Sequence, residues 1–168
     1  HPDNGTVSLA GNFNGVTYGS STFVAVGTYD NGSTSIKTST DATAWTYRTS
    51  GTTNTLNGVT YGNSTFVAVG NSATVLKSSD GTTWTTVSAT YEHPDNGTIR
   101  ERRNVDGGTC GSIGVVAVVN YDNGSTSIKT STDATAWNYR TSGTTNTING
   151  STDGTSKFVA VGNSATVL

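Results

Sequence analysis

The chain has 168 residues and a mass of 17.2 kDa, a length that suits a single domain. Its composition is dominated by 34 Thr, 20 Ser, 16 Asn and 21 Gly, whereas only 12% of the residues are charged and the net charge is −2. Such a charge excludes a basic nucleic-acid binder, and the longest apolar run is too short for a membrane-spanning helix. We therefore expect an ordered domain with a thin core, no nucleic-acid partner and no membrane insertion.

The sequence repeats itself at an offset of 92 residues. Residues 1–76 and 93–168 are identical at 56 of 76 positions, and most of the differences fall between residues 7 and 28. Each unit holds two related halves, because Asn14–Gly19 and Phe23–Gly27 recur 43 residues later as Asn57–Gly62 and Phe66–Gly70. A period of about 43 residues is typical of propeller blades. We predict two units, 1–92 and a truncated 93–168, which together form one propeller-like domain.

The elements follow in the same order within each half-unit. The second half-unit shows four short strand patterns, over residues 59–61, 65–69, 74–77 and 84–87, separated by Gly, Asn, Ser and Asp. Seven Asn-Gly pairs predict tight hairpin turns. No segment has helical spacing of apolar residues. The predicted fold is all-β: a β-propeller-like repeat array of about four blades of short antiparallel strands, which open near Phe13, Leu56, Val105 and Ile148.

The last blade is expected to be incomplete. Residues 93–168 stop at the counterpart of Leu76, so a fourth strand has no counterpart there, whereas residues 1–12 precede the first blade and could supply a spare strand. An unpaired strand edge recruits another strand. This pattern leads to the hypothesis that chains join end to end into filaments by completing one another's blades. The alternatives are that the spare strand completes the last blade of the same chain, or that the fourth strand belongs to a tail that the given sequence does not include.

A seven-residue segment in the second half-unit, called a heptad below, carries a family motif. Ser78–Trp84 reads Ser-Ser-Asp-Gly-Thr-Thr-Trp and follows the apolar strand 66–70. This order resembles the BNR or Asp-box class of β-propeller repeats, found in sialidase-like and photosystem-assembly-factor-like propellers, although Asp80 and Trp84 are one residue closer than in that consensus. The heptads Ser39–Trp45 and Ser131–Trp137 keep Ser, Asp and Trp but replace the Gly with Ala. The resemblance implies propeller blades and says little about function.

The residue types that the three heptads share are typical of a turn. An Asp carboxylate can accept backbone N–H bonds across a hairpin, and a Trp ring can fill the space between blades. We therefore assign structural turn and core roles to Asp41, Trp45, Asp80, Trp84, Asp133 and Trp137. Exposed sugar platforms are the alternative role for the three Trp side chains.

Catalytic chemistry is not expected. A sialidase site needs an arginine cluster with Tyr, Glu and Asp, but the chain has five Arg, of which Arg48 and Arg140 are copies of one repeat position, and only two Glu. Its two His lie in repeated His-Pro segments, and a single Cys, Cys110, forms neither an intrachain disulfide nor a metal site. We expect no enzyme, no cofactor and no metal.

The remaining motifs favour a protein that acts outside the cell or at its surface. Six Asn-Xaa-Ser/Thr sequons are candidate glycan attachment sites: Asn4, Asn31, Asn63, Asn96, Asn123 and Asn149. The function predicted first is a non-enzymatic structural or adhesive repeat protein that associates with itself. The alternative is a glycan-binding propeller lectin, with Tyr29, Tyr47, Tyr121 and Tyr139 as candidate sugar-binding aromatics.

Overall fold

The computed structural model describes residues 11–28, 36–87, 91–93, 97–99, 105–111, 114–119, 127–154 and 157–168. Within these ranges all regular secondary structure is β-strand. A helix long and apolar enough to cross a membrane is therefore not found in this part of the chain.

Four antiparallel sheets follow one another along the chain as blades, each with its strands in sequential order. Blade 1 comprises β1 (Phe13–Gly19), β2 (Thr22–Gly27), β3 (Ile36–Ser39) and β4 (Thr46–Arg48). Blade 2 comprises β5 (Leu56–Gly62), β6 (Thr65–Gly70), β7 (Val75–Ser78) and β8 (Thr85–Thr86). Blade 3 comprises β11 (Val105–Gly111), β12 (Gly114–Val119), β13 (Ser127–Ser131) and β14 (Asn138–Thr141). Blade 4 comprises β15 (Ile148–Gly154), β16 (Lys157–Gly162) and β17 (Thr166–Val167).

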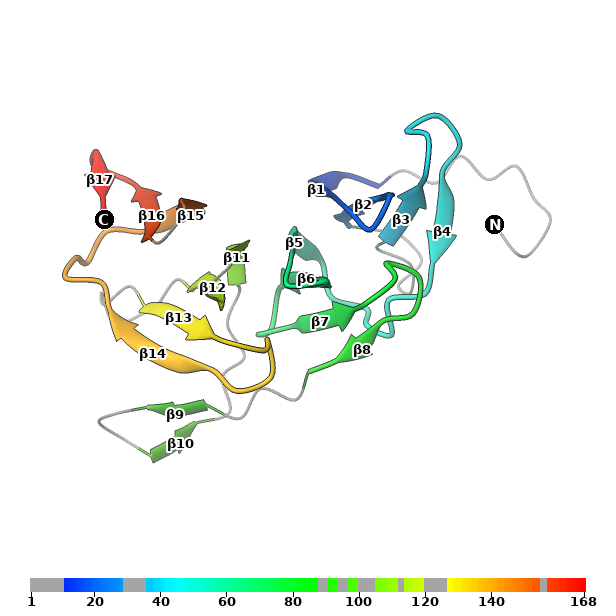
Figure 1. Ribbon diagram of the computed structural model, residues 1–168. Helices are drawn as coiled ribbons and strands as arrows, with labels where there is room; N and C mark the ends of the chain where they lie inside the picture. Colours follow the sequence, from blue (N-terminus) through cyan, green and yellow to red (C-terminus); the bar gives the residue numbers. More distant parts are fainter. Residues whose placement is uncertain are drawn as a thin grey trace.

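This arrangement confirms the predicted fold class. The four predicted blade starts are the first residues of β1, β5, β11 and β15, and blade 4 has three strands in the described part of the chain. The innermost strands of successive blades contact one another, β1 with β5, β5 with β11, and β11 with β15. The blades form an arc in which blade 1 and blade 4 lie at opposite ends (Figure 1).

The Asn-Gly pairs do not form hairpin turns where the structure describes them. Asn14-Gly15, Asn57-Gly58 and Asn149-Gly150 lie inside β1, β5 and β15, at points where the strand register shifts by one residue. The hairpin between β1 and β2 instead turns at Ser20 and Ser21, with φ of 45° and 58°. The turn prediction was therefore wrong at these three pairs, which occupy strand irregularities instead; at Asn14 and Asn57 the side-chain amide also donates to a carbonyl of the next blade. The other four Asn residues of such pairs lie outside the described residues.

Glycines allow the innermost strands to approach closely. A Cβ added at Gly15 would lie 3.1 Å from the Cα of Gly58, and one added at Gly62 would lie 2.6 Å from the Cβ of Cys110 in the next blade. The Cys110 backbone N–H also donates to the Thr60 hydroxyl at 2.9 Å. Bonds and contacts of this kind hold successive blades together near the centre of the arc.

The core lies between blades rather than within one sheet. One cluster joins blade 1 to blade 2 and is formed by Val24, Val26, Ile36, Leu56, Phe66, Ala68 and Leu76. A second cluster joins blade 2 to blade 3 and is formed by Val67, Val69, Val75, Val87, Val105, Cys110, Val115, Ala134 and Trp137. A smaller cluster around Ile148 and Ala160 joins blade 4 to blade 3, through Ile128. Each internal blade thus buries apolar side chains on both faces.

A two-stranded hairpin departs from the predicted blade pattern. Tyr91–His93 (β9) pairs with Gly97–Ile99 (β10), and β9 contacts β14. The predicted boundary between the two repeat units, 92/93, lies inside β9. Residues 1–10, which include most of the predicted spare strand, lie outside the described residues.

We predict that Gly62→Ala destabilises the protein by about 1–3 kcal/mol, because the new methyl group would overlap Cys110 and push β5 away from β11. The free energy of unfolding in urea measures this effect. Gly58→Ala in the same strand is the matched control: a Cβ at Gly58 would lie 3.7 Å from the Cα of Gly107 and 3.7 Å from the Val69 side chain, both ordinary contacts, so its unfolding free energy is expected to change by less than about 0.5 kcal/mol. Equal effects of the two substitutions would contradict the close-approach role.

Candidate functional site

The three Asp residues of the heptads organise turns between the third and fourth strands. The Oδ1 atom of Asp80 accepts the backbone N–H groups of Thr82 at 2.7 Å and Thr83 at 2.8 Å, and the Ser78 hydroxyl donates to it at 2.9 Å. These backbone hydrogen bonds, of which the one from Thr83 has the largest effect, lower the pKa of Asp80 from 3.8 to about 2. The carboxylate oxygen is thus occupied by the turn.

Asp41 and Asp133 repeat this geometry in blades 1 and 3. Asp41 accepts the backbone N–H groups of Thr43 and Ala44, and Asp133 accepts those of Thr135 and Ala136, at distances of 2.8–3.1 Å. The same bonds lower the pKa of both carboxyls. All three carboxylates point into their own turns and lie on different blades, so they do not converge on a common site.

The pKa of Asp80 gives a pH prediction. A carboxyl with a lowered pKa in the folded state stabilises the protein above its unfolded pKa of 3.8, and this contribution is lost as the pH falls toward about 2. We expect Asp80→Asn to lower the melting temperature at neutral pH and to reduce the loss of stability between pH 4 and pH 2, as measured by thermal denaturation across that range. The control, Asp153→Asn, removes the same charge from β15 outside such a turn. A variant and a control with the same acid dependence would contradict the prediction.

The three heptad Trp side chains differ in burial, depending on whether the described residues include a blade before theirs. Trp137 is 7% exposed and packs in the cluster between blades 2 and 3. Trp84 is partly buried, its ring centroid lies 6.4 Å from that of Phe66, and its Nε1 donates to the Gly81 carbonyl at 2.8 Å. Trp45 makes the corresponding bond to Ala42 at 3.1 Å and belongs to none of the buried clusters in the described residues. The ring therefore fills an inter-blade space wherever a preceding blade exists.

The two predicted sugar-binding tyrosines that the structure describes do not share a site. Tyr47 and Tyr139 lie in β4 and β14 of different blades, where the Nζ atoms of Lys37 and Lys129 stand 4.3 Å and 4.8 Å from the ring centroids. Lys129 is 1% exposed, so the pair in blade 3 is internal. Tyr29 and Tyr121 lie outside the described residues.

Two of the six sequon asparagines are described. Asn63 is exposed in the hairpin turn between β5 and β6, with φ of 48°. Asn149 is exposed in β15, and its amide donates to the Oδ1 atom of Asn163 at 2.9 Å. Asn4, Asn31, Asn96 and Asn123 lie outside the described residues.

The outer face of blade 4 is a feature that sequence reasoning missed. Val67, Val69 and Val75 of blade 2 are each 1% exposed, because blade 3 covers them. Their exact repeats in blade 4, Val159, Val161 and Val167, are 40%, 49% and 68% exposed. Identical residues in corresponding strands thus form a buried interface in blade 2 and an open apolar face, the valine face, in blade 4.

Blade 1, at the other end of the arc, also has an exposed apolar face, and this one carries aromatic side chains. Its first strand places Phe13, Val16 and Tyr18 at 55%, 64% and 56% exposure. The residues that occupy the Phe13 position in the other blades, which are Leu56, Val105 and Ile148, are 0–1% exposed. We call Phe13, Val16 and Tyr18, with Phe23 behind them, the aromatic face; the ring centroids of Tyr18 and Phe23 lie 4.6 Å apart.

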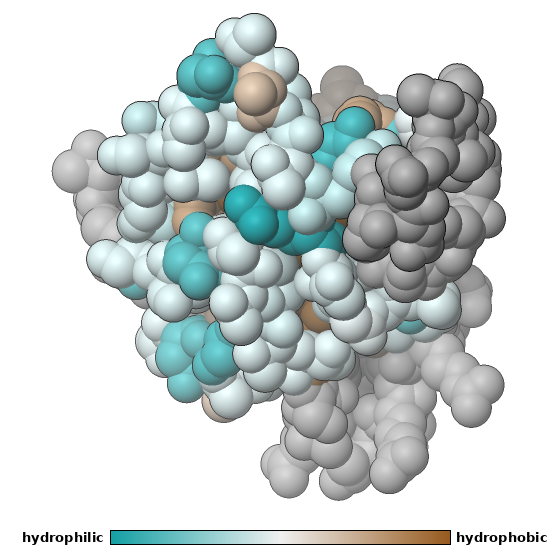
Figure 2. Space-filling model, turned by 90° about the vertical axis from the view of Figure 1, so that its right-hand side faces the viewer, coloured by the Kyte–Doolittle hydropathy of each residue, from teal (hydrophilic) through white to brown (hydrophobic). Residues whose placement is uncertain are grey.

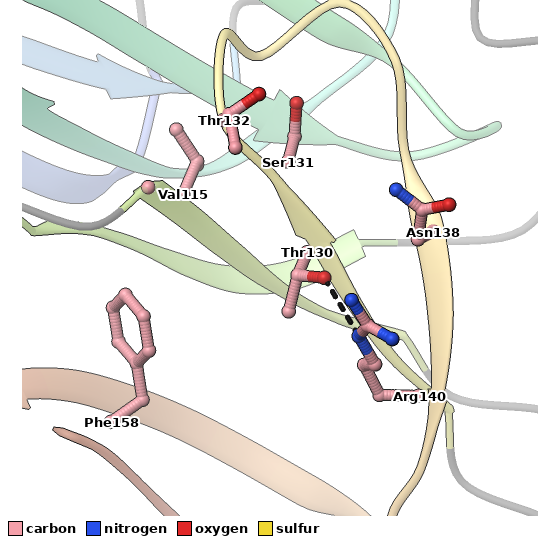
Figure 3. A pocket seen from close by; sticks show the side chains of 8 residues that line it. Val115, Thr130, Ser131, Thr132, Asn138, Arg140 and Phe158 are labelled. Atoms are coloured by element: carbon pink, nitrogen blue, oxygen red, sulfur yellow. Dashed lines mark hydrogen bonds between the residues drawn. The ribbon is translucent and has the colours of Figure 1, made fainter.

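A cleft of about 260 Å³ lies between blades 3 and 4. It is lined on blade 3 by Gly114, Val115, Ser131, Thr132 and Arg140, and on blade 4 by Phe158. Figure 3 shows the Phe158 ring on one side of the cleft and Arg140 on the other, where the Arg140 Nε donates to the Thr130 hydroxyl at 3.1 Å. No group of three or more potential metal-ligating side chains occurs among the described residues.

Comparison with known proteins establishes the fold. No family model and no curated protein matches the chain. A solved structure of YCF48 bound to D1 peptide matches with a TM-score of 0.61 and 13% identity, covering 94% of this chain and 48% of that one. A structure of YCF48 from Cyanidioschyzon merolae matches with a TM-score of 0.64 and 14% identity, covering 94% of this chain and 52% of that one.

These matches confirm the predicted likeness to photosystem-assembly-factor propellers at the level of the fold, because YCF48 is such a factor. The BNR or Asp-box class itself stays a prediction. The chain spans about half the length of the YCF48 structures that it matches. At this level of identity, the chain is a propeller-type array similar in fold to YCF48.

Proposed function

We propose that the protein is a non-enzymatic structural repeat protein that associates with itself head to tail, with the valine face of one copy packed on the aromatic face of the next. The observation that carries the proposal is the exposure of Val159, Val161 and Val167, whose repeats in blade 2 are buried by blade 3. Full burial of a Val side chain contributes about 1.5–3 kcal/mol, so an open face of this kind favours a partner.

The interface between blades 2 and 3 provides the template for this contact. Blade 4 repeats blade 2 without a change from Phe158 to Leu168, and blade 1 repeats blade 3 over most of its length. Ala134 and Trp137, which pack on the blade 2 valines, have Ala42 and Trp45 as counterparts in blade 1. Blade 1 therefore carries the side chains that a blade 4 valine face needs for cover.

Two further residues of blade 4, Asn149 and Gly150, correspond to residues that contact the next blade elsewhere in the chain. The Asn14 amide donates to the Leu56 carbonyl of the next blade at 2.9 Å, and the Asn57 amide donates likewise to the Val105 carbonyl at 2.9 Å. Asn149 holds the same position in blade 4, where the corresponding acceptor is the Phe13 carbonyl of a second copy. Gly150 likewise matches Gly15, which approaches the neighbouring inner strand, yet a Cβ at Gly150 meets no atom within 4 Å.

Disruption of either face is expected to abolish self-association. We predict that Val161→Asp shifts the protein to monomers in sedimentation-velocity and light-scattering measurements over a concentration series, because a carboxylate in an apolar interface is costly to desolvate. Thr145→Asp, which adds the same charge at an exposed loop position, is the matched control and should leave association unchanged. A wild-type chain that stays monomeric at all concentrations would contradict the proposal.

A mixing experiment tests the head-to-tail geometry. Val161→Asp retains the aromatic face, and Phe13→Asp retains the valine face, so each variant alone should be monomeric while an equimolar mixture should form a heterodimer. If Phe13→Asp alone dimerised, the contact would join two valine faces instead. Electron microscopy of the wild type distinguishes an open filament from a closed ring, since a head-to-tail contact yields either.

The proposal includes two further statements: the protein is not an enzyme, and it acts outside the cell or at its surface. The Asp carboxylates that could act as acids or bases are occupied by backbone N–H groups in their turns, which supports a structural role. Most of the coloured surface in Figure 2 is pale, which is the colour of residues with intermediate hydropathy such as Ser, Thr and Gly. This hydroxyl-rich surface with little charge supports a role outside the cell or at its surface, where adhesion would be the use of such an assembly.

Glycan binding is the second candidate function, favoured by the exposed rings of the aromatic face. Sugars pack their apolar faces on aromatic rings, and Lys37, whose Nζ lies 5.3 Å from the centroid of the Phe13 ring, adds a donor beside it. We expect Tyr18→Ala to reduce any signal on a glycan array, with Thr145→Ala at an exposed loop position as the control. Binding that is unchanged in Tyr18→Ala, or absent in the wild type, would contradict the lectin function.

A further inference from the structure

The hairpin between β5 and β6 carries a sequon at its tip. Asn63 and Ser64 are the two turn residues, with φ of 48° and 56°, and both are exposed. The sequon is completed by Thr65, the first residue of β6, whose hydroxyl donates to the Asn63 carbonyl at 3.3 Å. The hairpin tip therefore presents a complete Asn-Xaa-Thr sequon to solvent.

Blade 1 contains the same hairpin without the sequon. Residues 18–23 and 61–66 differ at one position, where Ser20 stands in place of Asn63. The φ of Ser20 is 45°, and the Thr22 hydroxyl donates to the Ser20 carbonyl at 3.3 Å, as Thr65 does to Asn63. Asparagine is enriched at such φ values, yet the serine adopts the same backbone. The shape of the turn alone therefore does not explain the amide of Asn63.

The other sequon in the described residues lies in a strand. The amide of Asn149, in β15, donates to the Oδ1 atom of Asn163 at 2.9 Å, and its repeat in blade 2, Asn57, makes the same bond to Asn71 at 3.1 Å. The amide nitrogen at this repeat position thus serves as a donor within its own blade. A sugar attached to Asn149 would stand against the turn that Asn163 begins. Of the two described sequons, the one at the hairpin tip is placed for modification.

We propose that the tip of this hairpin is an attachment site for an N-linked glycan, with Asn63 as the acceptor. The donor is an oligosaccharide carried on a lipid pyrophosphate, and a transferase is the catalyst. The Nδ2 atom of Asn63 forms a bond to C1 of the first sugar while the bond between C1 and the pyrophosphate oxygen breaks. The amide nitrogen gives up one proton, the pyrophosphate leaves as an anion, and no group is oxidised or reduced.

The surroundings of the turn suit a sugar. Tyr61, two residues before Asn63, is half-buried, and its hydroxyl lies 2.7 Å from that of Ser20, so the hairpin tips of blades 1 and 2 lie side by side. An aromatic ring and exposed hydroxyls offer a sugar an apolar contact and hydrogen bonds. Blade 2 lies at neither end of the arc (Figure 1), so a glycan there leaves the valine face and the aromatic face open.

This inference rests on the proposed location outside the cell or at its surface, because the donor and the transferase belong to the secretory route. The test uses the full chain, secreted from cultured eukaryotic cells behind a cleavable signal. Each sequon peptide is weighed before and after enzymatic release of N-linked glycans. We expect a glycan at Asn63 and none at Asn149 in the folded, secreted protein.

Two variants use the matched hairpins. Asn63→Ser restores the turn sequence of blade 1, so it should remove the glycan and leave the melting temperature of the deglycosylated protein unchanged. Ser20→Asn, added to the Asn63→Ser chain, completes a sequon in blade 1 because Ser21 and Thr22 already follow. This second variant should carry a glycan of the same mass on the blade 1 hairpin.

Three outcomes would overturn the proposal: a bare Asn63 in the folded wild type, a glycan at Asn149 with none at Asn63, or a bare blade 1 hairpin in the double variant. Peptide masses do not depend on self-association, so the mixing experiment and this one can fail separately. A bare Asn63 in protein from its natural source, together with a glycan at Asn63 in the secreted chain, would contradict the proposed location and support the acceptor site.

Discussion

Face-to-face packing of blades is the constraint on which the structure depends. Each blade is a small twisted sheet with apolar residues on both faces, such as Phe66 and Ala68 on one face and Val67 and Val69 on the other. A small sheet with apolar residues on both faces has to bury those faces against neighbouring elements. The clusters that supply the apolar core therefore lie between blades, and every blade at an end of the arc has one open face.

Polar groups set the spacing and angle of this packing. The Asn14 and Asn57 amides reach across to carbonyls of the next blade, and the Cys110 N–H bonds to Thr60. The Asp turns fix the position of the heptad residues, so that Gly81 and Trp84 enter the junction with blade 1. A chain with few large apolar residues thereby obtains a defined blade geometry from hydroxyl, amide and carboxylate groups that bond across and within the blades.

The proposed self-association follows from repetition. In a repeat protein each unit contacts its neighbours, so identical sequences meet different surroundings at the middle and at the ends. The valine face is the blade 4 version of a surface that blade 3 covers in blade 2. Its proposed partner is accordingly described by what covers it there, which is an apolar blade face.

The sequence by itself determined the fold class, the blade starts and the heptad turns, because strand alternation and the 92-residue repeat are local and periodic signals. It did not reveal the role of the Asn-Gly pairs, since the same two residues suit both a hairpin turn and the strand irregularity with an inter-blade amide bond that is found at Asn57-Gly58. Only the tertiary structure decided which copies of a repeated residue are buried. Val69 and Val161 have the same sequence neighbours, and their exposures of 1% and 49% differ because blade 3 covers one and no described blade covers the other.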